Sequence, residues 1–140
     1  MVPFAVIRRK GEPNDRHPHP TAAGRPVIAV IFEVEPHDGE ASRYFDLAAA
    51  LRPALEATDG FISVERFESL TRPGRYLSLS FWRDEASVRS WRCDGLHRDA
   101  QQAGRSTVFA GYRLRVATVM RDYGLTEREQ APADSLAALL

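Results

Sequence analysis

Residues 60–105 hold the feature that most constrains the fold of this 140-residue chain. Two runs rich in β-branched and aromatic residues, 61–69 and 75–83, are separated by a loop of hairpin length with a Pro-Gly pair. Such runs predict two antiparallel strands joined by a short connection. Asp84 follows directly and can cap a helix that carries Trp91. The order strand, strand, helix therefore fixes the centre of the architecture.

Three further elements surround this centre. Residues 27–35 (VIAVIFEVE) predict a strand, and residues 107–121 alternate regularly and predict another. Residues 41–57 predict a helix, because five residues recur at helical spacing and form one apolar face. They are Tyr44, Leu47, Ala48, Leu51 and Leu55. The resulting order β-α-β-β-α-β predicts a ferredoxin-like α+β fold, with a four-stranded antiparallel sheet and both helices on one face.

The other face of this sheet also carries large apolar residues from several strands. A monomer would leave that surface in water, so the pattern predicts a homodimer in which two sheets pack against each other. The domain is expected over residues 27–124. Residues 1–26 form an extension or linker, in which residues 3–7 could add an edge strand, and residues 125–140 form a polar tail.

Composition excludes several classes of function. Nineteen basic and nineteen acidic residues cancel, so no overall field favours nucleic acid or an anionic membrane. Cys93 is the single cysteine and cannot form an internal disulfide. No apolar run approaches the ~20 residues that span a bilayer, and the charges near the N-terminus follow the apolar patch instead of preceding it. These features predict a cytoplasmic protein without membrane contact.

One set of residues could form a functional site. Trp82, Trp91 and His97 lie close together in the sequence and can all face a pocket between the helices and the sheet. Phe32 and Tyr112, from two other strands, are predicted to complete its aromatic walls. Tryptophans at such a junction are often plain core, and a helical histidine is often structural, so this alternative stays open.

Other polar residues carry weaker signals. Arg105 could bind an anionic ligand, or it could pair with Glu65 or Asp99 within the fold. His17 and His19 lie in a proline-rich segment with no third ligand nearby, so no metal site is predicted. The chain has no phosphate-binding glycine loop, no GxSxG, no CxxC and no HExxH. We therefore expect no cofactor.

Four segments carry a resemblance to a known family: DGFISVERFES, YLSLSFWRDEASVRSW, LHRDAQQAGR and YRLRVATVMRDYG. Across about residues 27–124 the chain resembles the antibiotic biosynthesis monooxygenase family of dimeric α/β barrels. The resemblance implies a homodimer. In characterised members it implies cofactor-independent oxygenation of electron-rich aromatic polyketides, or haem breakdown.

The chain departs from those members at two places. Both chemistries use an asparagine in the first strand, and residues 27–35 contain none. Haem-degrading members also place a ligating histidine ten residues after a tryptophan, and counting from Trp91 that position is Gln101.

The combined expectation is a small monooxygenase acting on a planar phenolic or quinone-like substrate. Trp82 and Trp91 would stack on the substrate, His97 would serve as acid and base, and Arg105 would stabilise anionic charge. The alternatives are a non-catalytic ligand-binding or stress-associated dimer, and a haem-binding protein of the same fold.

Overall fold

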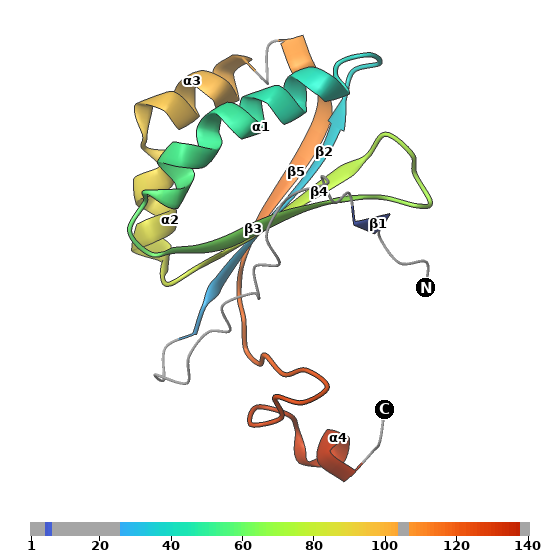
Figure 1. Ribbon diagram of the computed structural model, residues 1–140, viewed down its shortest axis with the longest axis vertical. Coiled ribbons are helices and arrows are strands. Elements are labelled where there is room, and N and C mark those ends of the chain that lie inside the picture. Colours follow the sequence, from blue (N-terminus) through green and yellow to red (C-terminus); the bar gives the residue numbers. More distant parts are fainter. Residues whose placement is uncertain (1–4, 7–25, 104–106, 138–140) are drawn as a thin grey trace.

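The computed structural model describes residues 5–6, 26–103 and 107–137 (Figure 1). The secondary structure follows the predicted order closely, with one addition at each end. The elements are β1 (Ala5–Val6), β2 (Ile28–Pro36), α1 (Ala41–Glu56), β3 (Phe61–Glu68), β4 (Tyr76–Trp82), α2 (Glu85–Arg92), α3 (Gly95–Ala103), β5 (Phe109–Thr118) and α4 (Ala133–Ala137).

The strands form one antiparallel sheet in the order β1-β3-β4-β2-β5. The four strands β2 to β5 are the predicted ferredoxin-like sheet, so the predicted fold class is confirmed. The two-residue strand β1 adds an edge beside β3. The second predicted helix is two helices, α2 and α3, which break at Asp94 and Gly95. Among the described residues, no helix is long and apolar enough to cross a bilayer.

The helices α1, α2 and α3 cover one face of the sheet (Figure 1). The side chains beneath them form two apolar clusters at opposite ends of the strands. One cluster contains Val34, Tyr44, Tyr76 and Val108. The other contains Leu55, Trp82 and Val88. The space between these clusters is where a cavity can form.

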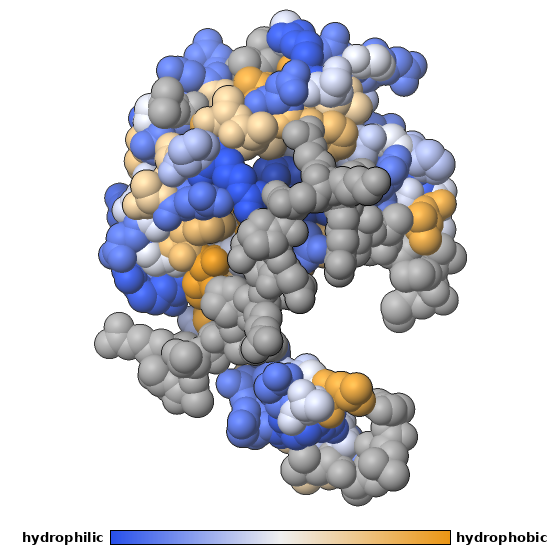
Figure 2. Space-filling model, in the orientation of Figure 1, coloured by the Kyte–Doolittle hydropathy of each residue, from blue (hydrophilic) through white to orange (hydrophobic). Residues whose placement is uncertain are grey.

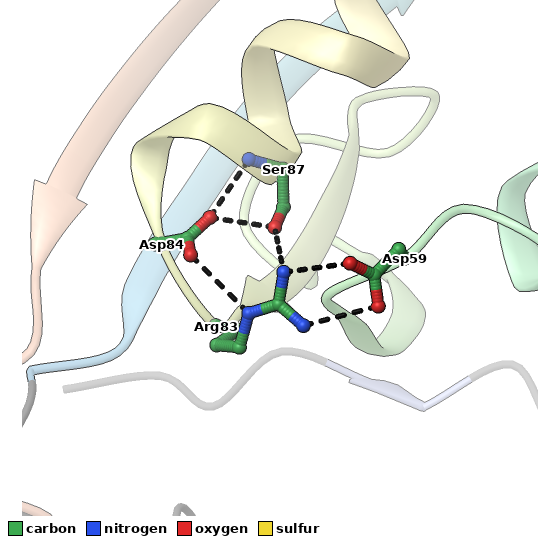
Figure 3. Close-up of polar contacts among 4 residues, drawn as sticks. All are labelled: Asp59, Arg83, Asp84 and Ser87. Atoms are coloured by element: carbon green, nitrogen blue, oxygen red, sulfur yellow. Dashed lines mark hydrogen bonds and ion pairs between the residues drawn. The ribbon is translucent and has the colours of Figure 1, made fainter.

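A polar network ties the start of α2 to the turn that follows α1 (Figure 3). Asp84 caps α2 as predicted, accepting hydrogen bonds from the Ser87 N–H at 2.8 Å and the Ser87 hydroxyl at 2.6 Å. Arg83 donates two hydrogen bonds to the Asp59 carboxylate, at 3.0 and 2.9 Å. These contacts hold β4, α2 and the α1–β3 turn in fixed relative positions.

Gly60 lies against this network and cannot be replaced without strain. Its φ of +86° is in the left-handed region, and a Cβ at this position would collide with the Ser87 hydroxyl.

The Ser87 hydroxyl and N–H, together with Arg83, lower the pKa of Asp84 to about 2. Arg83 likewise lowers the pKa of Asp59.

The other face of the sheet is not covered by α1, α2 or α3 (Figure 1). Strand alternation places the half-buried apolar side chains Ile31, Leu77, Leu79 and Phe81 on this face. Glu33 lies among them and accepts from Arg75 at 2.8 Å and from Arg115 at 3.2 Å. The hydrogen bond from Arg75 is the main reason that the pKa of Glu33 is lowered.

Candidate functional site

A cavity of about 240 Å³ lies between the three helices and the sheet. Its walls are mostly apolar and come from α1, α2, α3 and four strands. Tyr112, Leu114 and Val116 on β5 line it and are about half exposed, so the cavity opens along that strand. Figure 2 shows apolar residues reaching the surface on the helix side of the molecule, among polar ones. Size and lining suit a small, largely apolar ligand.

Trp91 and His97 form a stacked pair in the wall of this cavity. Their ring centroids are 4.6 Å apart, with an interplanar angle of 23°. His97 Nδ1 lies 3.2 Å from the Trp91 carbonyl oxygen. A carbonyl can only accept, so Nδ1 carries the hydrogen, and in the neutral ring Nε2 holds the free lone pair. The break between α2 and α3 makes this contact possible, with Asp94 accepting from the His97 N–H at 3.3 Å.

Burial sets the protonation of His97. Desolvation lowers its pKa, and the Trp91 carbonyl and Asp94 offset only part of that effect. The imidazole is therefore neutral at pH 7, with Nε2 able to accept a proton. This is the state that a general base needs.

Trp82 lies deeper than the sequence suggested for a stacking wall. It is 1% exposed, and its indole N–H donates to the Ser80 hydroxyl at 2.9 Å. It packs edge-on against Phe61, with ring centroids 5.3 Å apart. Trp82 lines one end of the cavity as part of the core, with its polar atom already satisfied.

Phe32 and Tyr112 come together as expected from two neighbouring strands. Their ring centroids are 5.6 Å apart, and both line the cavity. Phe109 packs against Phe32 and extends the same aromatic wall. Arg105 lies outside the described residues, so its predicted role stays a prediction.

Sequence reasoning gave no polar role in the cavity to Tyr44, Arg66 or Ser78, all of which line it. Tyr44 is 5% exposed, and its hydroxyl has no partner at hydrogen-bonding geometry. Burial raises the pKa of Tyr44, although Arg66 and Ser78 lie near enough to oppose this. The signal was present in β3, where alternation places Arg66 on the same face as Val64, beneath the helices.

The described residues contain no group of three His, Cys, Asp or Glu side chains that could hold a metal ion. Gln101 lines the cavity at the position where haem-degrading members carry their ligand. An amide is not among the side chains that usually hold haem iron, so this position does not fit haem.

A model of the antibiotic biosynthesis monooxygenase family matches residues 27–103, which is more than half of the chain. The chain belongs to the antibiotic biosynthesis monooxygenase family. The match covers β2 through α3, and so includes Trp82, Trp91, His97 and most of the cavity wall.

Two curated proteins are similar in sequence. One, from Pyricularia oryzae, is named jasmonate monooxygenase ABM and is 48% identical over 93 residues, 66% of this chain and 43% of its own length. The chain thus spans less than half of that relative. The other, YqjZ from Bacillus subtilis, is 29% identical over 69% of this chain and 82% of its own length.

Solved structures support the fold. Rv0793 from Mycobacterium tuberculosis superimposes with a TM-score of 0.63 at 17% identity, over 70% of this chain and 99% of that one. Protein SO0527 from Shewanella oneidensis superimposes with a TM-score of 0.62 at 14% identity, over 67% of this chain and 91% of that one. At such identities the likeness establishes the shared fold of the family and nothing about substrate.

Proposed function

We propose that this protein is a monooxygenase that binds a planar phenolic or quinone-like substrate in the cavity beneath the helices. Membership of the family supports the reaction type, and the aromatic lining supports the substrate class. The observation that carries the proposal is His97: Nδ1 is held by the Trp91 carbonyl, and Nε2 is free and unprotonated at neutral pH.

In this proposal, His97 Nε2 removes the proton from the substrate hydroxyl. The resulting phenolate is rich in electrons and reduces molecular oxygen without a flavin or metal. A phenol with an open ring position and one O₂ give a quinone and one water. One oxygen atom enters the ring as a carbonyl oxygen, and the other leaves as water with two hydrogens from the substrate. The protonated imidazole then returns its proton.

The aromatic residues position the substrate in this scheme. Trp91, Phe32 and Tyr112 present ring faces or edges to the cavity, and planar ligands stack well on such groups. Trp82 closes one end, where its burial makes it a rigid wall. Holding the substrate beside Nε2 gives the proximity that proton transfer requires.

The direct test is oxygen consumption by purified protein with an electron-rich naphthol, together with incorporation of ¹⁸O from ¹⁸O₂ into the quinone. Jasmonate belongs in the same panel because the Pyricularia oryzae relative is named for it. We expect His97→Ala to lower kcat by about 10²–10⁴-fold, the usual contribution of a general base. His37→Ala is the matched control, since His37 is exposed and lies outside the cavity lining.

Turnover in the wild type that His97→Ala leaves unchanged would contradict the role of His97. The pH dependence gives a second check. Because the pKa of His97 is lowered, activity should stay level at neutral pH and fall only in acid, where Nε2 becomes protonated. A Soret band on adding haem, lost in His97→Ala, would instead favour the haem-binding alternative.

We also propose that the protein is a homodimer formed through the uncovered sheet face. Ile31, Leu77, Leu79 and Phe81 give that face an apolar centre, too large to leave in water. A two-fold axis through the face would bring the same side chains together from both subunits. The tail beyond β5 extends away from the domain (Figure 1). Met120 and Leu125 in this tail are each 83% exposed and add further apolar surface.

A further inference from the structure

The side chains lining the cavity that can carry a charge near neutral pH are all basic. They are Arg66, Arg92 and His97, and no Asp or Glu of the described residues contributes to the lining. Arg92 is exposed, whereas Arg66 is half-buried on β3. An apolar cavity with cationic groups and no carboxylate has a positive potential that favours an anionic ligand.

Arg66 has no carboxylate partner among the described residues. Its Nε is buried without a hydrogen-bond partner, and it forms no ion pair with any carboxylate of the described chain. Arg66 lies beside Tyr44: the Arg66 Cζ is 5.9 Å from the centroid of the Tyr44 ring, and the Tyr44 hydroxyl is near enough for the guanidinium to act on its pKa. Leaving such a donor unpaired costs free energy, which a ligand with the opposite charge would recover.

Two hydroxyl groups lie beside Arg66. The Tyr44 hydroxyl is buried and unpartnered, and Ser78 is directly opposite Arg66 in the register of β3 and β4. All three residues line the cavity. An arginine fork with two hydroxyl donors is the set of groups that recognises a carboxylate.

We propose that the substrate of this cavity is an organic acid whose carboxylate binds Arg66, with Tyr44 and Ser78 as additional donors. The inference rests on the proposed function in placing the substrate in this cavity, and it adds the substrate class. The carboxylate is a binding group and takes no part in the reaction with oxygen. Arg66 is therefore a specificity-determining residue.

The sheet register separates the carboxylate from the reacting end. Ser78 marks the level of Arg66, and Trp82 is four residues further along β4, which is about 13 Å. Trp91 packs against the cluster that contains Trp82, and His97 stacks on Trp91. The acid therefore has an elongated apolar body, with the carboxylate at the end opposite the hydroxyl that His97 deprotonates.

The test compares an acid with its ester in the same binding assay. The probes are 6-hydroxy-2-naphthoate, which carries a phenol and a carboxylate at opposite ends, and its methyl ester. Titration calorimetry on the wild type should show the acid binding at least about tenfold tighter, as expected for charge-assisted hydrogen bonds. This comparison needs no variant and so does not depend on the folding of one.

Variants then locate the preference. Arg66→Gln should remove the tenfold preference while ester binding changes little, and Arg66→Lys should restore part of it. Tyr44→Phe should weaken acid binding a few-fold, because only a hydroxyl is lost. Arg89→Gln is the control, since Arg89 is exposed on α2 and outside the lining. Circular dichroism checks that each variant is folded.

Three results would overturn the inference: no binding of the acid, equal binding of acid and ester, or a preference that persists in Arg66→Gln. Oxygen uptake is measured separately, so the two proposals can fail independently. An Arg66-dependent preference without turnover supports the acid site and contradicts the monooxygenase proposal. Turnover without an Arg66-dependent preference for the acid supports the monooxygenase proposal and contradicts the acid site.

Discussion

Charged side chains have different partners on the two faces of the sheet. On the uncovered face, Glu33 is matched by Arg75 and Arg115, and the apolar side chains surround this ion-pair network. On the helix-covered face, the Arg66 Nε and the Tyr44 hydroxyl are buried without a hydrogen bond of good geometry, beside an open cavity. The first arrangement is complete within the chain, while the second leaves two buried polar atoms for which we propose a ligand.

The difference shows how to separate structural from functional polar groups in a small α+β domain. Net charge gives no help here, because acidic and basic residues balance over the whole chain. The local balance is informative: a cation with internal partners stabilises the fold, and a cation without partners at a cavity wall indicates the charge of the ligand.

The largest expected effect comes from disrupting the uncovered face. Leu79→Lys places a charge at its centre, between Ile31 and Glu65 in the register. We expect the dissociation constant of the proposed dimer to rise at least about a hundredfold, because removing a lysine charge from water in an interface is costly even when a carboxylate lies nearby. Sedimentation velocity over a concentration series measures this.

Leu70→Lys is the matched control, since Leu70 is 50% exposed in the loop between β3 and β4. Binding of 6-hydroxy-2-naphthoate to the Leu79→Lys variant tests whether the cavity is complete within one subunit. If Leu79→Lys and Leu70→Lys have the same sedimentation behaviour as the wild type, the proposed dimer face is wrong.

The second-largest expected effect comes from Gly60, which lies against the polar network at the start of α2. Gly60→Ala combines an unfavourable φ of +86° with a collision at the Ser87 hydroxyl. We expect it to lower the free energy of unfolding by about 2–4 kcal/mol, measured by urea denaturation. The uncovered face should be unaffected, so dimerisation of the folded variant should persist.

Gly74→Ala separates the two causes. Gly74 has a φ of +85°, but a Cβ there would meet no atom within 4 Å. Gly74→Ala should therefore lower the free energy of unfolding only by the backbone cost of a positive φ, about 1 kcal/mol. Equal losses in the two variants would show that the contact between Gly60 and Ser87 contributes nothing.

The smallest effect is a change of stability with pH on the helix-covered side. The folded pKa of Asp84 is about 2 and that of Asp59 is also lowered, both from 3.8. A lowered carboxyl pKa stabilises the folded state above about pH 4, and this contribution is lost as the pH falls towards 2. Asp84→Asn keeps a good helix cap but cannot titrate.

The urea midpoint of the wild type should therefore fall more steeply between pH 4 and pH 2 than that of Asp84→Asn. Parallel curves would mean that the cap of α2 does not depend on the charge of Asp84. Both carboxylates are exposed, so the difference should be modest.

Much of the fold could be predicted because it depends on local patterns. Alternation located the strands to within two or three residues at each end, and helical spacing assigned the buried face of α1, including Tyr44 and Leu55. Asp84 was predicted to cap α2 because an aspartate followed a strand and preceded a helix. Each inference needed only neighbours along the chain.

The site could be predicted only in part. Trp91, His97, Phe32 and Tyr112 were expected to meet, and they do line one cavity. The sequence left open whether Trp82 is a pocket wall or part of the core, because its burial depends on packing against Phe61, Leu55 and Val88 from three other elements. Arg66 was overlooked because a strand arginine usually faces solvent.

Taken alone, the sequence determined the order of the elements, the faces of the strands and helices, and the family to which the chain is similar. Tertiary structure decided which polar groups have partners. The His97 tautomer depends on a carbonyl six residues away across a helix break, and the surroundings of Arg66 depend on residues from α1 and β4. Strand and helix periods report which side of an element a residue occupies, but a hydrogen bond depends on distances between elements that only packing sets.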